Sequence, residues 1–218
     1  ADKLDTFALS NEPVLSNCKC IIISGKRKSG KDYVATILFD RLQRAGYPTL
    51  LLHISKPIKE RFARHCDLDL SELMSDRPYK ERYREKMVAW AEQQIAIHPH
   101  IFPHSALHDT LGSTDITPKV LLVVDARRPG DMSYFFNLLG RRNCMTIRLT
   151  ASQAVRIARG WIFTGGIDDA TTECGLDCFD DWDCVISNDS THDTHDDLVA
   201  MIVKFVSAKS DCDFDLDT

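Results

Sequence analysis

The sequence lacks any long apolar run and any excess of basic residues. No stretch reaches the ~18 apolar residues that a membrane-spanning helix needs, so we expect no membrane contact. Its 27 Lys and Arg residues stand against 32 Asp and Glu, a net charge of −5. Nucleic-acid binding normally shows as a basic domain, so we expect no such partner. The first residues also lack the charged-then-apolar order of a secretory signal, and we therefore expect a cytosolic protein.

The eight cysteines show none of the spacings that would indicate a structural role. No two of them form a Cys-x-x-Cys pair, and a chain of 218 residues can bury a core without disulfides. Cys174, Cys178 and Cys184 are close enough in sequence to suggest zinc, but their spacing does not match a zinc site. We therefore expect free thiols in a reducing compartment.

Five short runs rich in Ile, Val and Leu alternate with longer segments of helical character. They cover residues 20–24, 49–54, 119–125, 144–149 and 183–187. Such near-continuous apolar runs are typical of parallel strands that are buried on both faces. The pattern predicts a three-layer α/β/α fold with a five-stranded parallel sheet. The two clearest helices are predicted over 79–97 and from Thr194 onward, and a further helical run covers 33–45.

We expect one domain, because the length is only about one and a half times a usual domain of roughly 150 residues. Its core comprises residues 19–55, 118–150 and 182–207, followed by an acidic tail at 208–218. Two connections are too long for simple crossovers. The first, about 56–117, is predicted to be a helical insertion, and the second is about 151–181.

A phosphate-binding loop is the strongest local signal. The segment from Gly25 to Lys31 reads G-x-x-x-x-G-K between a predicted strand and a predicted helix. Its glycines let backbone N–H groups turn toward phosphate oxygens, and the helix N-terminus favours the anion. Asp32 replaces the usual Ser or Thr ligand of magnesium. Its carboxylate could hold Mg²⁺ directly or through water, or pair with a lysine.

Asp125 is the second candidate partner for magnesium. It ends the run Leu121-Leu122-Val123-Val124, as the carboxylate of a Walker B strand does. Ligands gather at the carboxyl ends of parallel strands, which favours this interpretation. An ordinary turn residue at the end of a strand is the alternative.

Basic residues recur at the predicted carboxyl edge of the sheet. Lys26, Arg27, Lys28 and Lys31 fall within six residues, more cations than a nucleotide alone requires. Others follow at Arg127, Arg128, Arg148, Arg156 and Arg159. Two phosphorylated substrates would repel each other strongly, so this recurrence predicts a site for several anionic groups.

At these residues the sequence resembles animal-type phosphomevalonate kinases, a family within the nucleoside monophosphate kinase-like P-loop enzymes. The resemblance extends over about residues 19–207. It is carried by SGKRKSGKD at 24–32, PIKE at 57–60 with YKE at 79–81, VDARR at 124–128, and RGWIFTGGIDDATTECGLDCF at 159–179. Asp32 also belongs to the loop of this family. The family carries basic residues near Gln94 and Ile95, and that contact does not carry over.

The resemblance implies transfer of the ATP γ-phosphoryl group to (R)-5-phosphomevalonate by a monomer that uses Mg²⁺. The acceptor would bind the insertion at 56–117, and residues 151–181 would form a lid. ATP would be held by Gly25, Lys26, Arg27, Lys28, Ser29, Gly30, Lys31, Asp32, Arg156 and Arg159, and the metal by Asp32 and Asp125. The acceptor would be held by Lys59, Lys80, Arg127, Arg128, Arg148 and Trp161. Catalysis would fall to Arg27, Lys28, Lys31, Arg127 and Arg128.

Three further features have weaker interpretations. Gly160, Gly165 and Gly166 are either flexible parts of the lid or ordinary turn residues. His100, His104 and His108 share a helical spacing, but we expect Pro103 to interrupt that helix and leave the histidines in solvent. Asp168, Asp169 and Glu173 could be a paired-carboxylate site, and we favour partners for the lid arginines or a hinge.

Two rival functions remain open. The first keeps the fold and changes the acceptor to a nucleoside monophosphate or dephospho-coenzyme A. The second is a non-catalytic nucleotide-binding switch. A guanine nucleotide switch is disfavoured because the sequence lacks the Asn-Lys-x-Asp motif.

Overall fold

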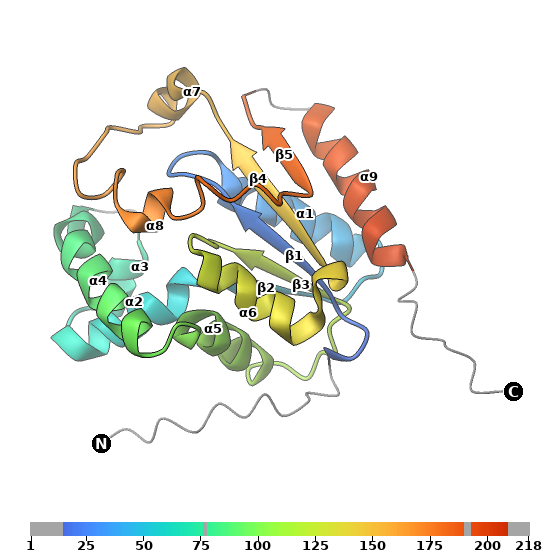
Figure 1. The fold of residues 1–218 in the computed structure, drawn as a ribbon, viewed down its shortest axis with the longest axis horizontal. Coiled ribbons are helices and arrows are strands. Elements are labelled where there is room, and N and C mark those ends of the chain that lie inside the picture. The colour runs from blue at the N-terminus through green and yellow to red at the C-terminus, as the bar shows by residue number, and fades with distance from the viewer. Residues whose placement is uncertain (1–14, 76–77, 190–192, 209–218) are drawn as a thin grey trace, which may run out of the picture.

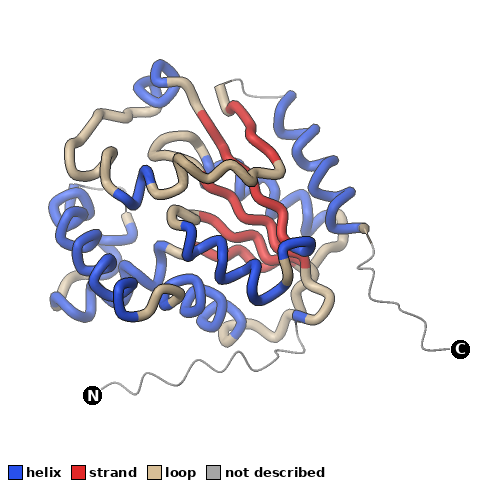
Figure 2. Tube along the Cα trace, viewed as in Figure 1, coloured by secondary structure: helices blue, strands red, loops and turns tan. Residues whose placement is uncertain are grey.

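The fold is a five-stranded parallel sheet with helices on both faces (Figures 1 and 2). The computed structural model describes residues 15–75, 78–189 and 193–208. The strand order is β2-β3-β1-β4-β5. The strands are β1 (Lys19–Ser24), β2 (Thr49–His53), β3 (Val120–Val124), β4 (Cys144–Thr150) and β5 (Cys184–Ser187). The predicted α/β fold is confirmed, and every predicted strand end agrees to within one residue.

The central strands of the sheet are buried. Ile22 of β1 lies opposite Val123 of β3 on one side and Thr146 of β4 on the other. All residues of β1 and β3 are buried. Strands that are buried on both faces cannot alternate polar and apolar side chains, which is why the sequence shows unbroken apolar runs.

Two helical layers enclose the sheet. On one face α1 (Lys31–Arg44) and α9 (Asp193–Ser207) pack their apolar side chains, among them Leu38 and Ile202, on the sheet. On the other face α5 (Ile101–Leu111) and α6 (Pro129–Leu139) do the same, with Phe102 and Phe135 fully buried. The short 3₁₀ helix η2 (Arg141–Asn143) then leads into β4. Figure 1 shows these layers on either side of the strands.

The connection from β2 to β3 is helical, as predicted. It contains α2 (Ser55–Cys66), α3 (Leu70–Met74), α4 (Pro78–Ile97) and α5. Phe62, Leu73 and Met87 form a small core of their own between α2, α3 and α4. Because α2, α3 and α4 share a small hydrophobic core, they form a stable unit beside the sheet. We call it the α2–α4 wall, and it lines one side of the candidate site.

The expectation that Pro103 breaks a helix is wrong. Pro103 is the third residue of α5, in the first turn, where a missing backbone N–H costs no helical hydrogen bond. Two of the histidines also contact other side chains, whereas we expected them in solvent. The His100 Nε2 lies 3.2 Å from the Ser133 Oγ, and the His104 ring meets the Tyr134 ring edge-on. His108 is exposed, in agreement with the expectation.

The connection from β4 to β5 crosses the carboxyl ends of the strands (Figure 1). It contains α7 (Gln153–Ala158) and α8 (Thr171–Cys174). We call residues 151–181 the lid segment. Gly160 and Gly166 in this segment have φ of 79° and 75°, values that side chains rarely tolerate, so both serve as turn residues here.

Candidate active site

The loop between β1 and α1 requires glycine at both ends. Gly30 has φ +90°, and a Cβ there would lie 2.3 Å from the Asn188 Nδ2. A Cβ on Gly25 would lie 2.7 Å from the Leu149 carbonyl oxygen of the neighbouring strand. Lys28, between them, also has a positive φ of 61°. The loop therefore keeps its shape because the backbone packs closely against β4 and the start of the β5–α9 connection.

Polar side chains from later in the chain hold the carbonyl groups of this loop. The Asn188 Nδ2 donates to the Ser29 carbonyl at 2.8 Å, and the Arg159 Nη1 donates to the same oxygen at 2.9 Å. The Arg156 Nε donates to the Arg27 carbonyl at 2.9 Å. Because the carbonyls have these partners, the loop can point N–H groups toward an anion.

Lys31, the lysine of the loop motif, lies at the carboxyl end of β3. Its Nζ is 2.9 Å from the Asp125 Oδ1 and 3.4 Å from the Asp32 Oδ2. Burial would raise the pKa of Asp125, but the charge of Lys31 and the neighbouring His53 ring hold it well below the ordinary aspartate value. Asp125 is therefore a carboxylate at neutral pH.

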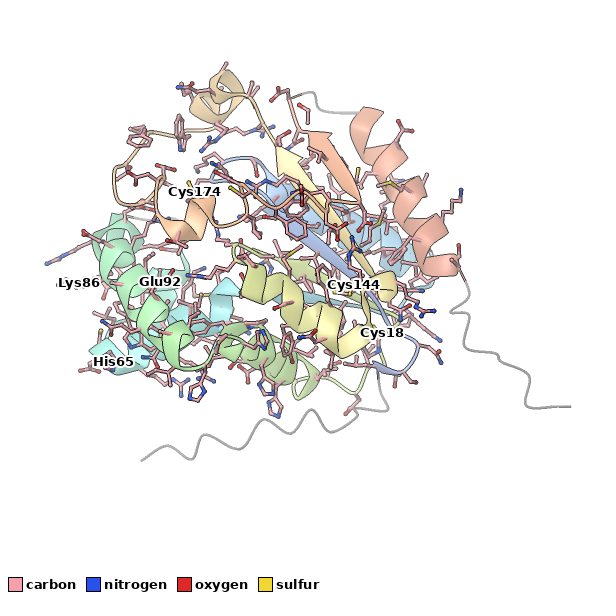
Figure 3. The ribbon with its side chains drawn as sticks, viewed as in Figure 1. Cys18, His65, Lys86, Glu92, Cys144 and Cys174 are labelled. Atoms are coloured by element: carbon pink, nitrogen blue, oxygen red, sulfur yellow. The ribbon has the colours of Figure 1, made fainter. Side chains whose placement is uncertain are left out.

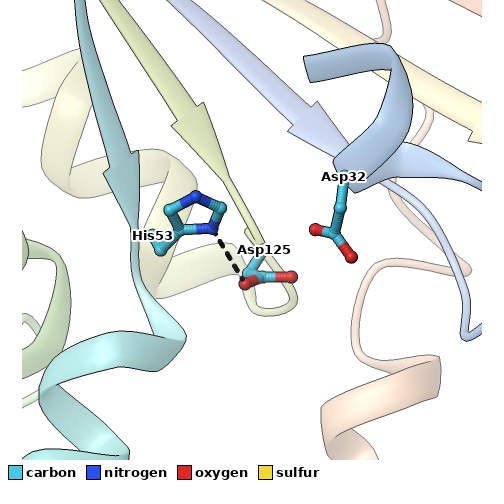
Figure 4. Close-up of side chains that lie close together, drawn as sticks. All are labelled: Asp32, His53 and Asp125. Atoms are coloured by element: carbon cyan, nitrogen blue, oxygen red, sulfur yellow. Dashed lines mark ion pairs between the residues drawn. The ribbon is translucent and has the colours of Figure 1, made fainter. Parts of the chain in front are cut away.

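Asp32, His53 and Asp125 converge beside this lysine (Figure 4). Each offers a ligand atom, and these atoms lie within 4.8 Å of one another. The His53 Nδ1 is 3.8 Å from the Asp125 Oδ2, and the Ser55 Oγ donates to that same oxygen at 2.8 Å. Carboxylate oxygens suit Mg²⁺, whereas an imidazole is not its usual ligand, so the donor set fits a magnesium ion held by the two aspartates.

A cavity of about 690 Å³ opens between the loop, the lid segment and the α2–α4 wall. The cations that line it come from all three parts and from the end of β3. They are Lys26, Arg27, Lys28, Lys31, Lys56, Lys59, Lys80, Arg84, Arg127, Arg128 and Arg159. The structure thus brings most of the basic residues singled out in the sequence to one cavity of an acidic chain.

Lys59 and Lys80 bring cations to the wall opposite the loop. Burial lowers the pKa of Lys59, and the positive charge of Lys80 lowers it further. Like charges that are held together in a partly dry site destabilise it until an anion arrives between them. The cavity therefore carries positive charge on the α2–α4 wall as well as on the loop.

Carboxylates hold several of the site's cations in place. The Arg27 Nη1 pairs with the Asp168 Oδ2 at 2.9 Å, and the Arg128 Nη2 pairs with Glu92 of α4, labelled in Figure 3, at 2.8 Å. Arg127 pairs with Glu173 of α8. Burial would lower the pKa of Arg127, yet the negative charges of Glu173 and Asp125 raise it overall.

Asp131 fixes the backbone of the two consecutive arginines. Its Oδ2 accepts hydrogen bonds from the backbone N–H groups of Arg127, at 2.9 Å, and Arg128, at 3.1 Å. It lies in the first turn of α6, where its carboxylate satisfies backbone N–H groups that have no partner within the helix. Both guanidinium groups therefore project from a stretch of backbone whose conformation is held by Asp131.

Not every predicted site residue lines the cavity. Gly25, Ser29, Arg148, Arg156 and Trp161 do not, whereas the others do. The Trp161 Nε1 donates to the Asp168 Oδ1 at 2.9 Å, and its ring stacks under the Arg156 guanidinium at 4.1 Å. The Arg148 Nη2 pairs with Asp177 at 2.8 Å. In this structure these side chains support the loop and the lid segment.

Several residues of the site were not predicted as such. His53 is the last residue of β2 and Ser55 is the first residue of α2, at the same edge as Asp125, and that strand end was an available signal. Arg84 lies one turn after Lys80 on α4, so the helical period could have indicated it. Glu92, Asp177 and Asn188 had no local pattern that points to the site.

An apolar patch adjoins the cations of the α2–α4 wall. Ile58, Met74, Met87, Val88 and Ala91 all line the cavity there. Apolar groups in a cationic pocket provide room for the hydrocarbon part of a ligand whose ends are charged.

The sheet order, the glycine loop and the cation-lined cavity at the carboxyl ends of the strands together define a P-loop kinase. The model of the phosphomevalonate kinase family matches residues 23–141. The phosphomevalonate kinase of Drosophila melanogaster is 43% identical over 177 residues, which cover 80% of this chain and 90% of the fly protein. This chain belongs to the phosphomevalonate kinase family.

Solved structures of other kinases are also similar. The APS kinase of Mycobacterium tuberculosis, in complex with AMPPNP and APS, has 15% identity and a TM-score of 0.46, and the match covers 88% of this chain and 99% of that one. The shikimate kinase of Acinetobacter baumannii has 11% identity and a TM-score of 0.44, over 89% and 96% of the two chains.

Proposed function

We propose that this chain transfers the γ-phosphoryl group of ATP to (R)-5-phosphomevalonate. The products are ADP and (R)-5-diphosphomevalonate, in isoprenoid and sterol synthesis. Family membership supports the activity, and one observation carries the assignment of the site. Lys59 and Lys80 place positive charge on the α2–α4 wall, in the same cavity as the cations of the phosphate-binding loop. A phosphorylated acceptor needs such a second cationic wall.

The acceptor is a phosphate monoester, so the chemistry needs no general base. Its second pKa is about 6, and the attacking oxygen is therefore largely deprotonated at neutral pH. That oxygen forms a bond to the γ-phosphorus while the bond from this phosphorus to the β,γ-bridging oxygen breaks. The protein must align two anions and spread the developing charge over cations.

The residues divide this task according to their positions. The loop from Gly25 to Asp32 would cradle the ATP phosphates, with Lys31 at the β- and γ-phosphates. Arg127 and Arg128, at the end of β3, would lie between the two substrates and serve the transferred group. Lys59 and Lys80 would hold the phosphate or carboxylate of the acceptor, and the apolar patch of the α2–α4 wall would face its branched hydrocarbon body.

Asp32 and Asp125 would hold Mg²⁺. Their carboxylates lie within 4.8 Å of each other at the mouth of the loop, which suits a single small cation with water ligands. When bound, the ion would neutralise charge on the ATP phosphates. His53 and Ser55 contact Asp125 and would orient its carboxylate toward that position.

The lid segment would close over the reacting groups and exclude water. Arg156 and Arg159 support this role, because both come from the lid segment and both donate to carbonyls of the loop. Movement of the segment would therefore be transmitted to the loop that holds ATP.

We further propose a cytosolic monomer. None of the described helices is long and apolar enough to cross a membrane.

A direct acceptor assay tests this function. The purified chain is given Mg-ATP with 5-phosphomevalonate, with a panel of nucleoside monophosphates, with dephospho-coenzyme A, or with no acceptor, and release of ADP is measured. We expect rapid ADP release only with 5-phosphomevalonate. Turnover of a nucleotide or of dephospho-coenzyme A, with none of phosphomevalonate, would refute the proposed acceptor. Absence of ADP release with every acceptor would favour the nucleotide-binding switch.

A further inference from the structure

Glu173 bridges three parts of the site. Its side chain is only 4% exposed, and each of its two oxygens has a different partner. The Oε1 pairs with the Arg127 Nη1, at the end of β3. The Oε2 accepts a hydrogen bond of 3.0 Å from the backbone N–H of Arg27, in the phosphate-binding loop. One carboxylate from α8 therefore joins the lid segment, the loop and the edge of the sheet.

The pairing uses one end of the Arg127 guanidinium and leaves the other end available. Nη1 donates to Glu173 and, at 3.1 Å, to the Thr172 carbonyl. Within the described part of the chain, the Nε and Nη2 atoms of Arg127 have no hydrogen-bond partner, and the residue lines the cavity. A rigid guanidinium that is anchored at one nitrogen presents its remaining donors in a defined direction.

A second observation shows that α8 is seated tightly against Arg127. A Cβ added to Gly175, directly after α8, would lie 2.8 Å from the Arg127 carbonyl oxygen and 2.6 Å from the Thr171 carbonyl oxygen. Only a glycine permits the backbone of the lid segment to approach the end of β3 this closely. The position of Glu173 is thus set by backbone packing as well as by its own hydrogen bonds.

We propose that Glu173 is a positioning residue for phosphoryl transfer, which acts by orienting Arg127 toward the reacting groups while anchoring the loop at Arg27. Both of its carboxylate oxygens are occupied by these two partners, so its action would pass through Arg127 and the loop. This inference rests on the proposed function, because the acceptor whose transfer Arg127 serves is the one proposed above.

The isosteric substitution Glu173→Gln tests the proposal sharply. A glutamine amide has one acceptor oxygen, so whichever way it turns, its NH₂ group must face either the Arg127 guanidinium or the Arg27 N–H. We expect kcat/KM for the acceptor to fall about 10- to 100-fold, since small misplacements of a positioning group have effects of this size. We expect the KM for ATP to change far less, because Asn188, Arg159 and Arg156 still hold the loop.

A double-mutant cycle separates positioning from general damage. If Glu173 acts through Arg127, then Glu173→Gln adds little to the loss that Arg127→Ala already causes. If the two substitutions acted independently, the loss of kcat/KM in the double variant would equal the product of the two single losses to within about twofold. Asp181→Asn is the matched control, because Asp181 ends the lid segment and pairs with Arg141 on the surface, outside the cavity. It should retain wild-type kcat/KM.

Three results would overturn the proposal: wild-type kcat/KM in Glu173→Gln, a KM for ATP that rises by as large a factor as kcat/KM for the acceptor falls, or losses that multiply fully with that of Arg127→Ala. Should Glu173→Gln fail to fold by circular dichroism, Glu173→Asp replaces it in the cycle. That variant keeps the charge but is one methylene too short to reach both partners, so an intermediate loss is expected and wild-type activity would contradict the idea. If the wild-type chain phosphorylates a different acceptor, the proposed function fails, and the same cycle on that acceptor decides the role of Glu173.

Discussion

The Lys31 Nζ lies 2.9 Å from the Asp125 Oδ1, so the lysine of the phosphate-binding loop is paired with the carboxylate at the end of β3. Both side chains are about nine-tenths buried. The pair keeps the lysine inside the site, at the position where the phosphates of ATP would meet it. Binding of ATP would offer Lys31 a more strongly charged partner and would leave Asp125 available to a metal ion.

Lys31→Met should abolish most of the activity. Methionine preserves the length of the side chain but removes the charge that would act on the β- and γ-phosphates, and we expect kcat to fall by about 10²- to 10³-fold. Steady-state kinetics with Mg-ATP measure the effect. Lys204→Met, on the exposed side of α9, is the control and should behave as wild type. Near-normal turnover by Lys31→Met would show that the loop assignment is wrong.

Asp32→Asn should raise the Mg²⁺ concentration that half-maximal activity requires. The substitution removes one of the two carboxylates of the candidate metal site, and we expect a shift of about 10-fold or more. Activity titrated with MgCl₂ at fixed ATP measures it, and chelation by EDTA should stop turnover in the wild type. Asp40→Asn, on the exposed side of α1, is the matched control. An unchanged Mg²⁺ titration for Asp32→Asn would remove Asp32 from the metal site.

Lys59→Met should weaken function and stabilise the fold at the same time. Burial and the charge of Lys80 lower the pKa of Lys59, which means that its charged form is penalised in the folded protein at neutral pH. Removing the charge should therefore raise the free energy of unfolding, measured in urea, while kcat/KM for the acceptor falls about 10²-fold.

The control for this experiment is Lys86→Met. Lys86 projects from the exposed side of α4 (Figure 3), on the same wall but outside the cavity. It should change neither quantity. A Lys59→Met protein that loses stability, or that keeps its wild-type kcat/KM, would contradict the role of Lys59 as a charge held ready for the acceptor.

Asp183 should contribute stability that disappears in acid. Burial would raise its pKa, but hydrogen bonds from Arg141 and from the backbone and hydroxyl of Thr146 lower it below the ordinary aspartate value. A group whose pKa is lower in the folded state stabilises the fold above its unfolded pKa of about 3.9, and this contribution is lost as the pH falls through the lower folded value. Asp183→Asn should therefore destabilise the protein at pH 7.

Urea unfolding of Asp183→Asn and the wild type between pH 3 and 7 measures this difference. It should be largest above about pH 5 and should shrink toward pH 3, because the carboxyl is then increasingly protonated in the wild type as well. Asp40→Asn supplies the baseline for an exposed carboxylate. A difference that stays constant with pH would mean that the charge of Asp183 is not what stabilises the start of β5.

The candidate site divides into residues that local patterns reveal and residues that they do not. Lys31 and Asp125 were predictable, because each sits at a fixed place in a strand–loop or strand–turn pattern, and the cavity contains both. Their direct contact was not predictable, since it depends on β1 lying beside β3. Glu173 is a similar case: the sequence marked it as a carboxylate near lid arginines, but its actual partners are Arg127 and the backbone of Arg27.

At Pro103 a local sequence pattern led to a wrong prediction. A proline in a helical pattern was expected to end the helix, yet the chain starts α5 two residues earlier, so that Pro103 falls in the permitted first turn. Where a helix begins depends on what its first turn packs against. Ile101 and Phe102 of α5 are both buried in the core beneath the sheet, and that packing is tertiary.

The layered α/β fold, the strand boundaries and the phosphate-binding loop can all be read from the amino-acid order, because they follow from hydrophobic period, glycine spacing and the succession of neighbouring segments. Which charges meet depends on the packing of distant segments. Lys26, Arg127 and Lys59 come from segments tens of residues apart, and a parallel sheet with crossover connections brings them to one cavity. A net charge of −5 cannot show this, because an average over the chain contains no information on where the folded backbone places each charge.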